Sequence, residues 1–80
     1  MAPMVINAEL TAPQERALAA SAVGLPDRWR VVVSADEVEG TFAFEVRIVG
    51  PTFVAVAAFR TEAHPIELAH FLERTKDEHA

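Results

Sequence analysis

The chain has 80 residues, no cysteine, 12 acidic against 7 basic residues, and a formal net charge of −5 at pH 7. This length allows one domain, and the lack of cysteine excludes a disulfide framework, so stability has to come from an apolar core. A hydrophobic fraction of 51% indicates that such a core forms. The negative charge disfavours direct binding to nucleic-acid phosphates and favours a protein partner with a basic surface.

Residues 1–10 precede the first predicted helix. The apolar stretch Met4-Val5-Ile6 belongs either to an N-terminal tail or to a short edge strand, and Pro3 limits its length. No basic residue precedes it, and no apolar stretch in the chain approaches the roughly 20 residues that a bilayer requires. We therefore expect no secretory signal, no membrane contact and a cytoplasmic location.

The sequence predicts a first helix between Thr11 and Gly24. Thr11 is suited to cap it, and Gln14 stands at the position that completes a capping box, with Pro13 tolerated in the first turn. Gly24 is placed to end the helix in a left-handed conformation, and Pro26 prevents its continuation.

Alternating apolar and polar residues predict three strands, over 29–34, 41–49 and 52–60. The dipeptide Gly50-Pro51 between the last two predicts a type II′ hairpin turn, with glycine at positive φ. We therefore expect an antiparallel meander.

This turn sets a register in which Ile48 pairs with Phe53 and Phe44 pairs with Ala57. The phenylalanines expected to share the core face are Phe42, Phe44, Phe53 and Phe59. The opposite face is only half polar, because Val54, Val56 and Ala58 lie on it.

A second helix is predicted from Pro65, with His64 as its boundary residue. The predicted fold class is thus α+β, in the order helix, three-stranded antiparallel meander, helix, with residues 4–6 as a candidate extra strand. Residues 11–76 form one domain, and residues 77–80 form a C-terminal tail.

In a meander, the loop after the first strand and the exit of the third strand lie at the same end of the sheet. Acidic residues are concentrated in both segments, and we call the surface that they are expected to form the acidic pole. It consists of Asp36, Glu37, Glu39, Glu62 and Glu67. We expect it to bind a protein partner, with Trp29, Val54 and Val56 as secondary contacts.

The sequence offers little for catalysis or metal binding. His64 and His70 are six positions apart, a spacing that one helix face does not present together. Ser34 lacks the glycine-rich surroundings of a nucleophile elbow. We expect a non-enzymatic protein with no cofactor and no metal site.

The chain is short, forms a single domain without catalytic motifs and contains the acidic run Asp36-Glu37-Val38-Glu39. In these features it resembles the class of small inhibitors that phages encode against bacterial defence systems, which includes anti-CRISPR proteins. This resemblance implies a protein that blocks a nucleic-acid-binding channel in the host cytoplasm. The alternative is a small structural or regulatory protein that forms a homodimer through its sheet.

The order of elements also resembles the double-stranded-RNA-binding fold. Such domains carry basic residues at the start of their second helix, where this chain has Glu62 and Glu67. Direct RNA binding is therefore not expected.

Overall fold

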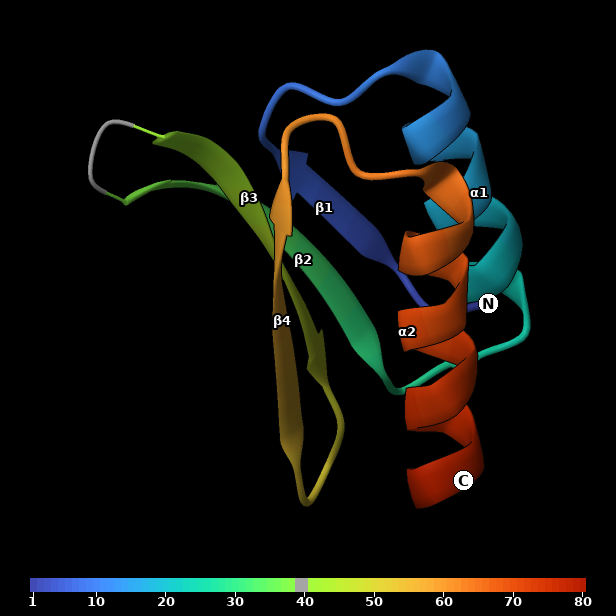
Figure 1. Ribbon diagram of the computed structural model, residues 1–80. Helices are drawn as coiled ribbons and strands as arrows, with labels where there is room; N and C mark the ends of the chain where they lie inside the picture. Colours follow the sequence, from blue (N-terminus) through green and yellow to red (C-terminus); the bar gives the residue numbers. More distant parts are fainter. Residues whose placement is uncertain (39–40) are drawn as a thin grey trace.

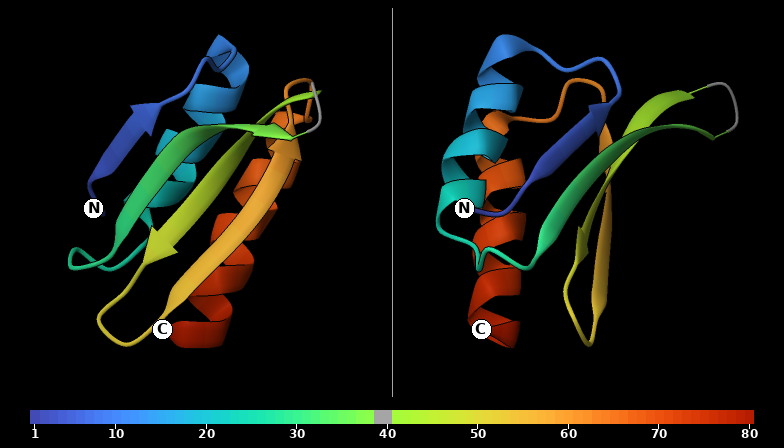
Figure 2. Two further views of the ribbon diagram at one scale, coloured as in Figure 1. Left: turned by 90° about the vertical axis from the view of Figure 1, so that its left-hand side faces the viewer. Right: turned by 180° about the vertical axis from the view of Figure 1, so that it is seen from behind.

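The computed structural model describes residues 1–38 and 41–80, except for the side chains of residues 36–38 and 41–42. The elements are β1 (Met4–Asn7), α1 (Ala12–Val23), β2 (Arg30–Val38), β3 (Thr41–Val49), β4 (Val54–Arg60) and α2 (Pro65–His79). The helices lie side by side on one face of the sheet, and the other face carries no helix (Figures 1 and 2). This is an α+β fold of two layers. Within the described residues, neither helix has the length and apolar character needed to cross a bilayer.

The sheet has the strand order β1-β2-β3-β4. The antiparallel meander predicted from the sequence is formed by β2, β3 and β4. The open question about the first ten residues is resolved as an edge strand, because β1 pairs in parallel with β2, with Ile6 beside Val33. The sheet is therefore mixed, and α1 makes the crossover between its two parallel strands.

The predicted register of the β3–β4 hairpin is wrong by two residues. Ile48 pairs with Ala55 instead of Phe53. The N–H of Gly50 donates to the carbonyl of Phe53 at 3.0 Å, so residues 51–52 form the turn. A shift by two preserves which side chains face the helices, because the side-chain period of a strand is two. The predicted core face is therefore kept, although the side chain of Phe42 lies outside the described residues.

The physical reason for the shift is a close approach between Phe53 and Gly50. A Cβ at position 50 would lie 2.1 Å from a ring carbon of Phe53, so the position needs the small size of glycine for this approach. The ring of Trp29 packs edge-on against Phe53, with centroids 4.8 Å apart. Trp29 is only 3% exposed, so the prediction that it contacts a partner is wrong.

The ends of both helices also differ from prediction. Helix α2 continues to His79, whose ring stacks on Phe53 at 4.0 Å, so the predicted tail is helical up to its last residue. Gly24 has φ −81° and ψ −6°, which is a right-handed conformation. The chain stays close to the helix there because the Leu25 N–H donates to the Ala22 carbonyl at 3.1 Å and Leu25 is buried.

The core lies between the sheet and the helices. Side chains of β2 and β3 contribute one side, and the apolar stripes of the helices contribute the other. Its buried members are Ala2, Leu18, Ala22, Leu25, Trp29, Val31, Val33, Phe44, Val46, Ile48, Leu68, Phe71 and Leu72.

Candidate binding site between β4 and α2

The β2–β3 ribbon extends past its neighbours in the sheet. Strand β1 ends beside Ser34, and β4 ends beside Ala43. Asp36 and Glu37 therefore lie on the projecting part of β2, which Figure 1 shows reaching away from the helices. Their side chains, and the whole of Glu39, lie outside the described residues.

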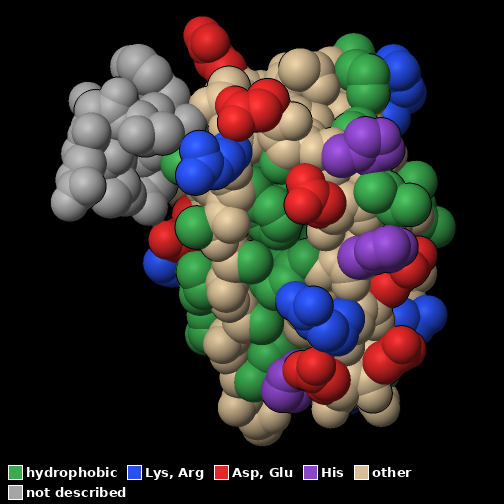
Figure 3. Space-filling model, viewed as in Figure 1, with side chains coloured by type: hydrophobic (Ala, Val, Ile, Leu, Met, Phe, Trp, Pro, Cys, Tyr) green, Lys and Arg blue, Asp and Glu red, His purple; other side chains and the backbone are tan. Residues whose placement is uncertain are grey.

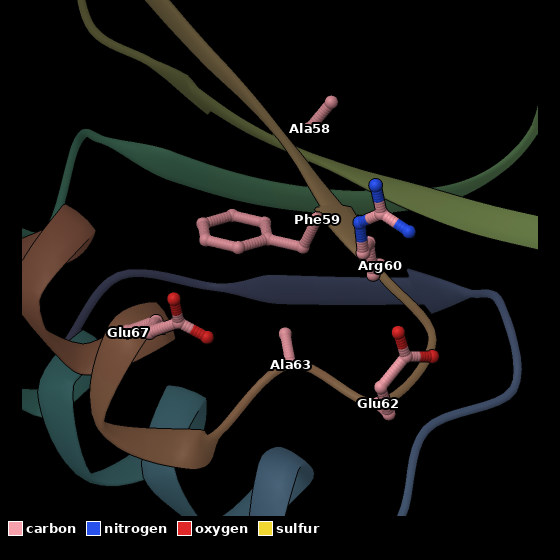
Figure 4. A pocket seen from close by; sticks show the side chains of 6 residues that line it. All are labelled: Ala58, Phe59, Arg60, Glu62, Ala63 and Glu67. Atoms are coloured by element: carbon pink, nitrogen blue, oxygen red, sulfur yellow. The ribbon is translucent and has the colours of Figure 1, made fainter.

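The other two predicted acidic residues, Glu62 and Glu67, come together at one pocket. This pocket has a volume of about 350 Å³ and lies beside the end of β4, next to the start of α2 (Figure 4). Its lining consists of Ala58, Phe59, Arg60, Glu62, Ala63 and Glu67. The structure thus brings together a pair of carboxylates from the predicted acidic pole, and adds the aromatic ring of Phe59, which the sequence predicts in the core.

Gln14 positions the loop that carries Glu62. Its side-chain Nε2 donates to the carbonyls of Thr61 at 3.0 Å and Ala63 at 2.9 Å. Its Oε1 accepts from the N–H of Thr11 at 3.0 Å, which is the predicted capping box. With only 2% of Gln14 exposed, one buried amide both caps α1 and holds the pocket loop against it. The sequence indicated the capping role but gave no signal for the second one.

A second capping box positions Glu67 at the start of α2. The Nδ1 of His64 accepts from the N–H of Ile66 at 3.1 Å, and Oε2 of Glu67 accepts from the N–H of His64 at 3.0 Å. Pro65 occupies the first turn, as predicted. The carboxylate of Glu67 is therefore fixed at the pocket rim by the backbone.

Phe59 forms the apolar floor of the pocket and is held from two sides. Its ring stacks on Phe44, with centroids 5.7 Å apart, and packs edge-on against Phe71 at 6.0 Å. The ring is still partly exposed. Figure 4 shows it turned toward α2, with the carboxylates of Glu62 and Glu67 on either side of Ala63.

Arg60 also lines the pocket but forms no ion pair with these carboxylates. It pairs with Ala43 on the outer face of the sheet, and its guanidinium points away from Ala63 in Figure 4. In the described part of the chain, no ion pair joins Arg60 to Glu62 or Glu67. The pocket therefore combines the apolar ring of Phe59 with two carboxylates that form no ion pair and with the side chain of Arg60.

Apolar surface continues from the pocket along β4. Val54 and Val56 on the outer face are 59% and 50% exposed, which makes them available as the predicted secondary contacts. On the inner side, Phe53, Ala55 and Ala57 are partly buried. Figure 3 shows hydrophobic side chains as a band along this side of the molecule, with charged and histidine side chains next to it.

The groups considered for chemistry lie apart or are engaged. Ser34 lies beside Glu45 on the outer face, whereas the His64 ring accepts the backbone hydrogen bond described above. Among the side chains that the structure describes, those of residues 1–35 and 43–80, no three suited to metal binding lie together. What the pocket offers is an aromatic ring together with two carboxylates, an arrangement that suits a cationic side chain.

No protein-family model matches this chain, and neither a curated protein nor a solved structure is significantly similar to it. Its function is therefore argued from the geometry of the pocket and of β4.

Proposed function

We propose that this chain is a non-enzymatic binding protein that binds a basic protein partner at the pocket between β4 and α2. The observation that carries the proposal is the pair Glu62 and Glu67, which line one pocket with Phe59 and form no ion pair with Arg60, the one Lys or Arg side chain in the described lining. Carboxylates next to an aromatic ring attract Lys and Arg side chains, and the net charge of −5 adds attraction at longer range.

The most specific form of the proposal is an inhibitor of a bacterial defence complex, of the kind that phages encode against CRISPR systems. Such an inhibitor acts by occupancy, because an acidic surface placed in a Lys/Arg-rich channel excludes the nucleic acid. In this form, the acidic residues Asp36, Glu37 and Glu39 extend the contact; Asp36 and Glu37 belong to the projecting part of β2, and Glu39 lies outside the described residues. The place of action is the cytoplasm of the host.

The test compares two double variants in retention experiments with host lysate and purified nucleic-acid-guided complexes. Glu62→Gln/Glu67→Gln removes the charges at the pocket, while glutamine keeps an acceptor for the capping box of α2. Glu73→Gln/Glu78→Gln is the control, because it removes the same charge from exposed positions of α2.

We expect the pocket variant to lose the partner at moderate salt and the control variant to keep it. For the inhibitor form, the unmodified chain has to block target-DNA binding by the retained complex, and the pocket variant has to restore it. Equal retention of the two double variants at every salt concentration would contradict the proposal.

A second candidate function is a structural or regulatory homodimer that buries the outer face of the sheet. The observation in its favour is the exposure of Val54 and Val56 on a face that carries no helix (Figure 2). Sedimentation velocity over a range of concentrations tests it. A dimer that Val56→Glu converts to a monomer supports this function, and a monomer at all concentrations rules it out.

A further inference from the structure

The hydrogen-bonding groups of β4 divide into two sets. The Gly50 N–H bonds to the Phe53 carbonyl, so this pair is a hydrogen-bonded pair of the β3–β4 ladder. Such pairs alternate along antiparallel strands. Ala55 and Ala57 therefore bond to β3, whereas the N–H and C=O groups of the alternate residues point to the open edge of the sheet. These residues are Val54, Val56, Ala58 and Arg60, of which Arg60 already accepts a bond from the Ala63 N–H at 3.0 Å.

This edge has few of the features by which proteins block strand addition. It runs for seven residues and contains neither proline nor any charge except Arg60 at its end. Long apolar edges normally carry inward charges, prolines or bulges, because their unpaired backbone groups accept a further strand. A strand that pairs with an edge also gains backbone hydrogen bonds whatever its side chains are.

The pocket lies where a side chain of an added strand would enter. Residues that face each other across a ladder point to the same side of the sheet. A residue opposite Phe59 therefore points toward α2, into the space of about 350 Å³ between Phe59, Ala63 and the carboxylates of Glu62 and Glu67. This space accommodates a long side chain, and its two carboxylates outnumber the one guanidinium of Arg60 in the lining, which favours a positive side chain.

A second copy of β4 does not supply that side chain. If two copies of β4 paired symmetrically and antiparallel along their whole length, the middle residue Ala57 of one copy would lie opposite Ala57 of the other. In this pairing, Ala55 of the second copy lies opposite Phe59. A methyl group leaves most of the pocket empty, which costs packing energy. The edge and the pocket together therefore favour a different segment over self-association.

We infer that β4 accepts an extended protein segment as a fifth strand, with a Lys or Arg side chain of that segment entering the pocket beside Phe59. This inference rests on the proposed function and specifies the form of its partner. The backbone of the segment pairs with Val54, Val56 and Ala58, and its alternate side chains point to the side of the sheet that carries α2.

The probe is a displayed library of random nine-residue peptides, selected against the immobilised chain and followed by synthesis of the most enriched sequence. We expect the enriched peptides to share β-branched residues and a Lys or Arg at one fixed position. Replacing that basic residue by leucine in the synthetic peptide is expected to weaken binding by about tenfold. No enrichment, or enrichment without a basic position, would overturn the inference.

Two changes test the backbone pairing separately from the charge. Val56→Pro removes an N–H that points to the open edge, which edge strands tolerate, and Val56→Thr is the matched control that keeps it. The second change is N-methylation of alternate amides of the peptide, which removes the N–H groups that would pair with β4 and leaves the protein itself unchanged. We expect Val56→Pro and N-methylation to abolish binding and Val56→Thr to preserve it.

The outcomes separate this inference from the proposed function. If Glu62→Gln/Glu67→Gln abolishes binding of basic partners while Val56→Pro and N-methylation have no effect, strand addition is wrong and the proposed function stands. If the pocket double variant binds as the unmodified chain does, both fail. Self-association through β4, detected as a dimer that Val56→Pro dissociates, would also overturn the inference.

Discussion

The two edge strands of the sheet, β1 and β4, differ in their length and in the residues that limit further pairing. The short edge strand β1 has four residues and is anchored at its start, where the Pro3 carbonyl accepts from Val31 at 3.0 Å and the Ala2 N–H donates to Ala22 at 3.3 Å. Strand β4 has seven residues, with Arg60 at its end as its one charge. The comparison indicates that the chain leaves one edge available for pairing and limits the other by length and by proline.

Exposed apolar side chains alone do not distinguish these edges. Val5 in β1 is 45% exposed and Val56 in β4 is 50% exposed, and both belong to one row across the outer face. The difference lies in the length of unpaired backbone and in the pocket, which lies beside the end of β4. A docking edge is thus better recognised from its backbone and its neighbours than from its exposed valines.

The largest expected effect compares proline at adjacent positions of β4. Ala57→Pro removes an N–H that bonds to β3 and should lower the free energy of unfolding by about 3 kcal/mol. Val56→Pro removes an N–H at the open edge and should cost about 1 kcal/mol or less. Urea denaturation measures both. Equal losses would show that the two sets of β4 backbone groups have been assigned wrongly.

The next effect concerns the loop that follows β4. Gln14→Ala removes the buried amide that holds the Thr61 and Ala63 carbonyls, and we expect a loss of roughly 2 kcal/mol in the free energy of unfolding. Glu15→Ala at the next, exposed position is the control and should cost about 0.5 kcal/mol or less. Similar losses for the two variants would mean that Gln14 does not anchor the pocket loop.

A smaller effect is expected at the start of α2. His64→Ala removes the Nδ1 acceptor of the Ile66 N–H and should cost about 1 kcal/mol. His64→Asn should restore most of that stability, because asparagine is a favourable cap. Thermal unfolding followed by circular dichroism compares them. An asparagine variant no more stable than the alanine variant would contradict a capping role for His64.

The smallest effect belongs to the anchored side, before β1. The N-terminal ammonium of Met1 donates to Asp27, and this hydrogen bond, followed by the charge of the ammonium, lowers the pKa of Asp27. The pair therefore stabilises the fold above the usual aspartate pKa of about 3.9 and loses that contribution as the pH falls through the lowered value.

Asp27→Asn should consequently reduce the melting temperature slightly at pH 7, and the difference should disappear at strongly acid pH. The effect is small because Asp27 is exposed to solvent. A difference between the two proteins that grows as the pH falls would contradict the direction of the pKa change.

Local patterns predicted most of the fold. The Thr11 and Gln14 capping box, the alternation of the strands in the meander and Pro65 at the start of α2 are all present, because each depends on residues close in sequence. The sequence does not predict the pairing of β1 with β2, since a strand of four residues gives little signal and its partner lies beyond a helix. The hairpin register was wrong because the ring of Phe53 needs the space beside Gly50, a contact that turn statistics do not include.

Of the candidate site, the sequence predicts only the acidic residues. Glu62 and Glu67 were expected at one end of the sheet, and they line one pocket. The alternation of residues in β4 predicts that Phe59 faces the helices, and hence the core. It does not predict how much of the Phe59 ring α2 covers. The two hydrogen bonds that Gln14 Nε2 donates reach Thr61 and Ala63, which are 47 and 49 positions away in the sequence, so no local pattern reveals them.

Amide hydrogen exchange along β4 tests the central claim most directly. In the dilute chain, we expect the amides of Val54, Val56 and Ala58 to exchange quickly and those of Ala55 and Ala57 to exchange slowly. Adding the selected Arg- or Lys-containing peptide should slow the first set. Slow exchange of Val56 in the chain alone, or an unchanged Val56 amide in the presence of bound peptide, would contradict strand addition at β4.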